Sequence, residues 1–193
     1  MAINSVLGSD QANAYISAMQ ADAYFANTFN LARWNAFATS DKEIALIMAT
    51  KNLEVLDYYG TKCDPSTTDP ARPQSLQWPR SGVTVRGYTW VCNEMPPALA
   101  QATAMLALEL AENPTAIAGG GAAAGSTGAI KEQKLGDLSQ SFYDVNPNSE
   151  VSTKVSATAP LVLQKFPWLV DVLNGYFQNA TSTGGRVITR VLN

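Results

Sequence analysis

A long, proline-rich connection between two helical segments constrains this chain more than any other feature. It runs over residues 60–95, and four of the ten prolines lie within residues 65–79. Connections in compact domains are usually short and polar. This one carries Trp78, Pro79 and Arg80 in sequence, and a tryptophan in a loop favours packing against the body of the protein. We therefore expect these three residues to anchor the loop, with Arg80 bonded to a carboxylate or to backbone carbonyls.

The same loop also invites a nucleic-acid interpretation, because its aromatic residues alternate with arginines. Trp78 lies near Arg80, and Arg86 lies near Tyr88 and Trp90. Proteins that bind single strands use such groups as stacking platforms in a positive groove. The formal net charge is −3 with no dense basic run, whereas phosphate binding usually requires a basic surplus. The composition favours the structural interpretation of the loop.

Two serines mark expected helix starts in the first third of the chain. Ser17 with Gln20 has the spacing of a capping box, as does Ser40 with Glu43. The first predicts a helix over residues 18–27, followed by a helical turn over 31–38. The second predicts a helix over residues 41–58 that stops at Gly60. We expect its buried stripe to consist of Ile44, Ile47, Met48, Val55 and Leu56.

The rest of the chain alternates between helical and irregular patterns. Pro96 and Pro97 predict the start of a buried helix over 98–112, and the Gly/Ala-rich stretch 118–128 predicts a flexible loop. Alternation around Gly136 predicts a β-hairpin over 130–143. Pro167 predicts a helix over 168–177, with a turn before it over 161–166.

Residues 184–193 are predicted to form a strand after a pair of glycines. A β-prone end of this kind can add to a partner's sheet or dock on its own domain, and the pattern leaves both open. We take the partner interface to comprise Arg186, Val187, Ile188, Arg190, Val191 and Leu192. The expected fold class is mainly α: a small helical bundle over residues 1–183 with a long Pro-rich loop and one β-hairpin, and an extended C-terminal arm over 184–193.

The residue types restrict the chemistry that the chain could perform. It contains no histidine, which excludes histidine bases and imidazole metal ligands. Neither a phosphate-binding glycine loop nor a Gly-x-Ser-x-Gly elbow is present. Cys63 and Cys92 could close one disulfide, but in a reducing cytoplasm we expect both to be small buried hydrophobes. We expect no enzyme activity, no cofactor, no metal site and no membrane span.

Several of these segments together carry a resemblance to a known family. The chain resembles tailed-phage proteins labelled DnaT-like single-stranded-DNA-binding proteins, several of which are understood as head–tail adaptors. The Leu-Gln-Trp-Pro-Arg element between two helices is the most specific part of the resemblance. The segments that carry it are 21–25, 41–43, 76–82, 95–99, 109–111 and 131–138.

The resemblance implies a structural role in the virion. It implies a ring of about twelve copies between the portal protein and the tail or neck proteins, with packaged DNA passing through the lumen. The protein would be assembled in the host cytoplasm and reside in the virion neck. The alternative that the family label implies is a single-stranded-DNA-binding accessory protein of replication.

Overall fold

The computed structural model describes residues 2–63, 74–117, 132–135, 138–141 and 160–178. Within these ranges there are six helices and three two-stranded antiparallel sheets. The helices are α1 (Ala18–Phe25), α2 (Leu31–Asn35), α3 (Thr39–Leu53), α4 (Pro97–Glu112), α5 (Leu161–Lys165) and α6 (Trp168–Val172). The strand pairs are β1 (Thr61–Lys62) with β2 (Arg80–Ser81), β3 (Thr84–Val85) with β4 (Tyr88–Thr89), and β5 (Glu132–Leu135) with β6 (Leu138–Ser141).

The expected fold class, a mainly α bundle with one hairpin, is wrong. Two of the three strand pairs lie inside the segment 60–95 that we predicted to be a loop. Strands of two residues are too short to show the alternation of apolar and polar residues that identifies a strand in a sequence. The described part of the chain is a mixed structure, in which helices are joined to small antiparallel sheets.

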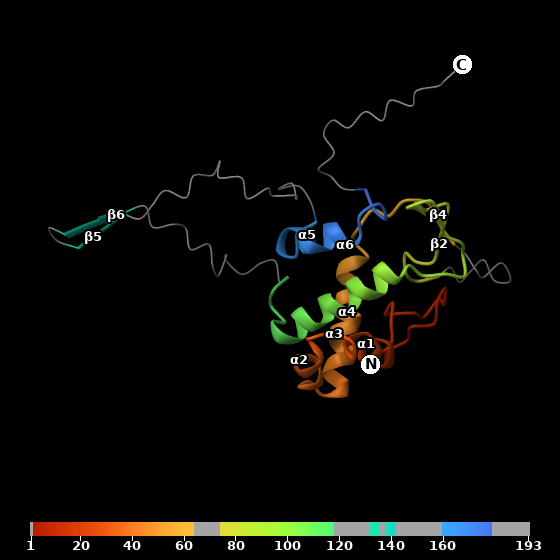
Figure 1. Cartoon of the computed structure of the whole chain (residues 1–193), viewed down its shortest axis with the longest axis horizontal. Coiled ribbons are helices and arrows are strands. Elements are labelled where there is room, and N and C mark those ends of the chain that lie inside the picture. Colours follow the sequence, from red (N-terminus) through yellow and green to blue (C-terminus); the bar gives the residue numbers. More distant parts are fainter. Residues whose placement is uncertain (1, 64–73, 118–131, 136–137, 142–159, 179–193) are drawn as a thin grey trace, which may run out of the picture.

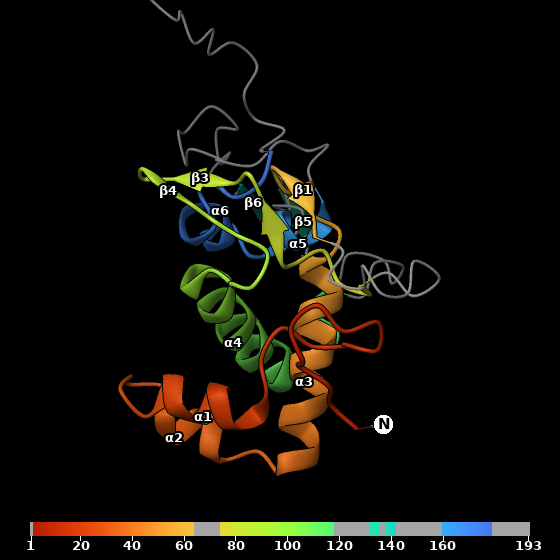
Figure 2. The same ribbon diagram turned by 90° about the vertical axis from the view of Figure 1, so that its right-hand side faces the viewer.

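Helices α3 and α4 form the centre of the molecule. They pack against each other, α6 packs on α4, and α1 contacts both central helices. In Figures 1 and 2, α1 and α2 lie at one end of this pair, and β1–β4 lie with α5 and α6 at the other. The largest fully buried side chains come from both ends: Phe25, Trp34, Leu46, Leu53, Trp78, Val83, Leu99, Leu106, Leu108, Leu163, Leu169 and Leu173.

Local signals placed the start of α1 correctly but not that of α3. The Ser17–Gln20 capping box is present, because the Ser17 Oγ accepts from the Gln20 N–H and the Gln20 side chain accepts from the Ser17 N–H. Helix α3 begins at Thr39, two residues before the start that a Ser40 cap would give, with Ala38 as an N-cap that makes no side-chain bond. It also ends at Leu53, before the predicted stop at Gly60. The Ser40–Glu43 capping box is therefore absent.

The buried face of α3 also differs from the prediction. Ile47 and Leu56 are buried, but Ile44, Met48 and Val55 are exposed. The helix turns a different side to the core, and that side is lined by Ala45, Leu46, Ala49, Thr50 and Leu53. Small residues such as Ala45 and Ala49 let α4 approach closely, so the larger aliphatic residues are left on the outside.

The C-terminal half contains one confirmed hairpin and a shortened helix. Strands β5 and β6 pair with Leu135 opposite Leu138, which confirms the hairpin predicted over 130–143. Helix α6 is shorter than the predicted 168–177, and the expected turn before it is the helix α5. The predicted flexible loop 118–128 and the predicted arm 184–193, with all six of its interface residues, lie outside the described residues.

Candidate functional site

Trp78 occupies the core at the end of the molecule where β1 and β2 pair. Its side chain is only 1% exposed. The ring makes edge-on contacts with Tyr58 at 5.9 Å and with Tyr176 at 6.2 Å between centroids. The Trp78–Pro79 peptide bond is cis, and Pro79 is also buried. A base could not stack on this tryptophan without unpacking the core, so Trp78 is unavailable as a stacking platform.

Arg80 is bonded to the backbone that follows α3. Its guanidinium donates to the carbonyl oxygens of Tyr59 at 2.7 Å, Gly60 at 2.8 Å and Tyr58 at 3.2 Å. It also donates to the side-chain oxygen of Gln77 at 2.7 Å. The residue is only 9% exposed. A planar guanidinium can donate to several acceptors at once. The acceptors of Arg80 named here are three backbone carbonyl oxygens and one side-chain oxygen of the same chain.

The same region contains a carboxylate that the sequence did not single out. Both oxygens of Glu54 accept from the Gln77 N–H, at 2.9 and 3.0 Å, and Oε1 also accepts from the Tyr15 hydroxyl. Burial raises the pKa of Glu54, although these hydrogen bonds act in the opposite direction. Burial likewise raises the pKa of Tyr15 well above its usual value. Glu54 thus joins the loop to the N-terminal segment.

Gly60 and a disulfide complete the fastening of the loop. Gly60 has a φ of +72°, and a Cβ placed on it would lie 2.3 Å from the carbonyl oxygen of Ser81, so this position requires glycine. Cys63 and Cys92 form a disulfide, with their Cα atoms 5.5 Å apart. The expectation that both cysteines are free hydrophobes is wrong: the β1–β2 pairing places Cys63 beside Pro79, and the β3–β4 hairpin turns the chain back before Cys92, so the two residues come within disulfide reach.

The β3–β4 hairpin holds the remaining aromatic and arginine residues of the loop. Arg86 lies at its turn with a φ of +51°, and both Arg86 and Tyr88 are exposed. The rings of Tyr88 and Trp90 meet edge-on at 4.9 Å, and the Tyr88 hydroxyl donates to Glu94 at 2.7 Å. The structure therefore separates the predicted aromatic set, with Trp78 and Arg80 inside the molecule and Arg86 and Tyr88 on its surface.

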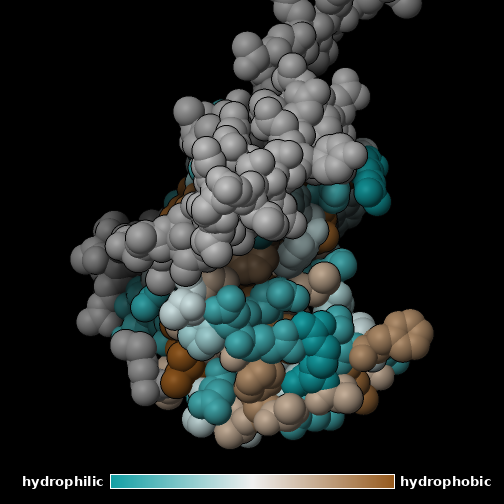
Figure 3. All heavy atoms as spheres, turned by 90° about the vertical axis from the view of Figure 1, so that its left-hand side faces the viewer, coloured by the Kyte–Doolittle hydropathy of each residue, from teal (hydrophilic) through white to brown (hydrophobic). Residues whose placement is uncertain are grey.

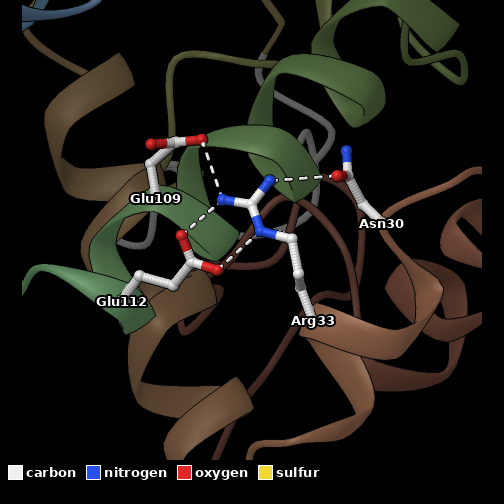
Figure 4. Close-up of polar contacts among 4 residues, drawn as sticks. All are labelled: Asn30, Arg33, Glu109 and Glu112. Carbon is white, nitrogen blue, oxygen red and sulfur yellow. Dashed lines mark hydrogen bonds and ion pairs between the residues drawn. The ribbon is translucent and has the colours of Figure 1, made fainter.

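An exposed ion cluster joins α2 to the end of α4 (Figure 4). The Arg33 guanidinium donates to both carboxylate oxygens of Glu112 and to the Asn30 side chain, and it lies 3.7 Å from Glu109. The hydrogen bond from Arg33 lowers the pKa of Glu112. Exposed pairs of this kind contribute ~0–1 kcal/mol, so the cluster positions α2 more than it stabilises the fold.

Asp22 forms a second polar cluster, with Trp34 of α2 and Lys42 of α3. Its Oδ1 accepts from the Trp34 Nε1–H at 2.6 Å and from the Lys42 ammonium at 2.9 Å. The Lys42 Nζ also lies 5.2 Å from the centroid of the Trp34 ring. Partial burial raises the pKa of Asp22, but the bonds from Lys42 and Trp34 outweigh it and hold that pKa below its usual value. The cluster ties α1 to α2 and α3.

No catalytic or metal-binding arrangement emerges among the described residues. In those ranges no three His, Cys, Asp or Glu side chains are grouped so as to hold a metal ion. A hollow beside Trp78, lined by residues 5–9 and by Tyr15, has a volume of about 10 Å³, which is room for one water molecule. Nor is any helix in the described part of the chain long and apolar enough to cross a bilayer.

Comparison with protein families gives one match. Residues 1–183 fit the model of the family described as "Putative DnaT-like ssDNA binding protein". The chain belongs to this family. No curated protein and no solved structure matches it. Family membership covers nearly the whole chain, including the loop with Trp78 and Arg80, and extends beyond the last described residue of this DnaT-like protein.

Proposed function

We propose that this DnaT-like family member is a structural assembly protein, the head–tail adaptor of a tailed phage, which forms a ring between portal and tail. One observation supports it above the others: the Trp78–Arg80 element, the most specific part of the resemblance, is used to hold the protein's own loop to its own core. A loop built in this way makes a rigid body for contact with neighbours. Under this proposal the protein is assembled in the host cytoplasm and resides in the virion neck.

Exposed apolar side chains agree with a role in holding neighbours. Met19 on α1 is 80% exposed, and Phe29 in the turn between α1 and α2 is fully exposed. Figure 3 shows one face, on which hydrophobic areas are scattered among hydrophilic ones rather than joined in a single patch. When one patch of a subunit contacts a different patch of the next, the copies form a ring if the rotation closes. Such a ring of about twelve copies is what we propose.

Quantitative mass spectrometry of purified virions tests this role. The adaptor proposal predicts that the protein is present in a near-stoichiometric ratio to portal protein. Its absence from particles, while it is abundant in infected cells, would exclude the adaptor role. An unrelated replication protein of the same phage serves as the control for carry-over of cell contents.

Single-stranded DNA binding is the second candidate, and the description of the family favours it. In the structure, the β3–β4 hairpin offers the best place for it, because Arg86 and Tyr88 are both exposed there and the Tyr88 ring contacts that of Trp90. Arginine and aromatic residues together can bind the phosphate and the face of a base. Two features oppose it: the net charge of −3, and the carboxylate of Glu94 bonded to the Tyr88 hydroxyl.

A titration with a fluorescent oligonucleotide at several salt concentrations tests this second role. If the hairpin binds DNA, affinity falls steeply with salt, and Tyr88→Ala loses ~1–3 kcal/mol of binding free energy. Tyr59→Ala is the matched control, since Tyr59 is a comparably exposed tyrosine outside the hairpin. Equally weak binding of the oligonucleotide by the wild type, Tyr88→Ala and Tyr59→Ala would exclude the hairpin as a DNA site.

A further inference from the structure

The Cys63–Cys92 disulfide joins two residues that differ in their access to solvent. Cys63 follows directly after β1 and is only 3% exposed. Cys92 lies three residues beyond the end of β4 and is exposed. The rate of thiol–disulfide exchange depends on which sulfur the attacking thiol can reach. A dissolved thiol therefore reaches this disulfide from the Cys92 side.

The Cys63 half is held in place by bonds that do not involve the disulfide. Its N–H donates to the carbonyl oxygen of Pro79 at 3.0 Å, and the neighbouring Lys62 pairs with Arg80 in the β1–β2 register. The Arg80 guanidinium in turn donates to the carbonyl oxygens of residues 58–60, just before β1. These bonds keep β1 paired with β2 when the disulfide opens.

The Cys92 half is held differently. The backbone bonds on either side of Cys92 stay within its own segment of the chain. The Trp90 N–H donates to the carbonyl oxygen of Val83 at 2.9 Å, and the Glu94 N–H donates to that of Val91 at 3.2 Å. The disulfide supplies a covalent tie between the β4 side of the hairpin and β1, to which these two hydrogen bonds do not contribute.

Exchange at Cys92 needs one reagent, a low-molecular-weight thiol such as glutathione. The glutathione thiolate forms a bond to the Cys92 sulfur, the bond between the two cysteine sulfurs breaks, and the Cys63 sulfur leaves with the electron pair and takes up a proton. A second glutathione thiolate then attacks the sulfur of the bound glutathione. The Cys92 sulfur leaves and is protonated, so both cysteines end as thiols and the two glutathiones end as their disulfide.

From this asymmetry we propose that Cys92 is a site of S-thiolation, at which a low-molecular-weight thiol opens the disulfide and releases residues 88–95 while β1 and β2 stay paired. Exposed disulfides are the ones that thiols open and that serve regulation. The tie thus answers to the thiol content of the surrounding medium. The inference does not depend on the virion role, because it concerns the isolated chain.

Single-cysteine variants test which sulfur is accessible. The folded full-length chain carrying Cys63→Ala or Cys92→Ala is mixed with an excess of an aromatic disulfide reagent, and the coloured thiol that is released gives the rate. We expect Cys92 to react at least ~10-fold faster than Cys63, and the two rates to become equal in urea. Equal rates without urea, or a faster reaction of Cys63, overturn the proposal.

The wild-type chain offers a check that needs no substitution. The oxidised protein is exposed briefly to glutathione without urea, quenched with acid and cut into peptides for mass analysis. We expect glutathione on Cys92 and a free thiol at Cys63. Glutathione on Cys63 overturns the proposal, and so does a disulfide that stays intact until urea is added.

Hydrogen exchange followed by mass spectrometry tests the release of the segment. Labelling times are kept short, so that exchange through global unfolding does not contribute. Reduction should speed the exchange of amides in residues 88–95 and leave the peptides of α3 and α4 unchanged. Equal exchange of residues 88–95 in the oxidised and reduced chains overturns the release, and so does an equal rise in α3 and α4. None of these measurements uses virions, so this proposal and the adaptor proposal fail separately.

Discussion

Replacing Arg80 with methionine removes the group that holds the loop to the end of α3. Methionine keeps most of the aliphatic stem but has no donor for the carbonyls of Tyr58, Tyr59 and Gly60 or for Gln77. Of these acceptors, the Tyr58 carbonyl is bonded in a buried setting, whereas those of Tyr59 and Gly60 lie nearer the surface. Water can therefore replace some of the lost bonds, but not all of them.

The expected loss of stability follows from that difference. A buried acceptor left without a partner costs ~1–3 kcal/mol, and each bond that water can replace contributes ~0.5–1.5 kcal/mol. We expect Arg80→Met to lower the free energy of unfolding by ~2–5 kcal/mol. For a chain of this size, each kcal/mol corresponds to ~2–4 °C in Tm, so the Tm should fall by roughly 4–20 °C.

Urea unfolding followed by tryptophan fluorescence measures this loss. Arg86→Met is the matched control, because Arg86 is exposed on the β3–β4 hairpin and surface substitutions of this kind usually change stability by less than ~0.5 kcal/mol. Equal midpoints for wild type and Arg80→Met would refute the reasoning, since a guanidinium that contributes nothing cannot be holding the loop. Equal losses in both variants would show a general effect of charge.

Three more predictions follow from the same region and from α1. Gly60→Ala should cost more than ~2 kcal/mol in unfolding free energy, because it adds a clash with the Ser81 carbonyl oxygen to an unfavourable φ. Gly82→Ala is the control: its φ is similar but a Cβ there would meet no neighbouring atom, so it should lose only ~1 kcal/mol. Cys92→Ala should cost ~3–4 kcal/mol by the loop-entropy relation for a separation of 29 residues, and a reducing agent should abolish the difference from wild type; an unchanged urea midpoint in oxidising buffer would contradict it. Asp22→Asn should lower the free energy of unfolding at neutral pH. The difference in unfolding free energy between wild type and variant should narrow as pH falls through the depressed pKa of Asp22, since a lowered carboxylate pKa stabilises the fold only while the group is ionised. A difference that stays constant between pH 7 and pH 2 would count against this prediction.

Signals that depend on a few neighbouring residues predicted their elements well. The capping box of α1, the proline start of α4 and the β5–β6 hairpin each follow from local chemistry, and the structure contains all three. The orientation of α3 could not be obtained in this way. Both of its faces carry apolar residues, so the period of the sequence does not say which face meets α4. The face that carries the small alanine side chains is the one that meets α4, because small side chains allow close contact between two helices.

The candidate site was only partly accessible from the sequence. The proximity of Trp78 and Arg80 suggested a loop held to the body, but nothing nearby pointed to Glu54, which lies 23 positions before the Gln77 amide that it accepts from. The disulfide is also a product of the fold, because the β1–β2 pairing and the β3–β4 hairpin together bring Cys63 within reach of Cys92. Contacts between residues far apart in the chain leave no local pattern.

The bridge between Tyr58 and Phe177 determines how a mechanical load would enter the molecule. Tension on the chain beyond Gln178 first meets the hydrogen bonds that join residues 57–59 to residues 176–178. Gln178 lies opposite Asp57, at the end of the pair that leads back to α3, so a pull directed away from α3 loads the Gln178–Asp57 bond first and the Tyr59–Tyr176 bond second. Once both bonds are open, the load runs along the backbone to α6, which packs on α4.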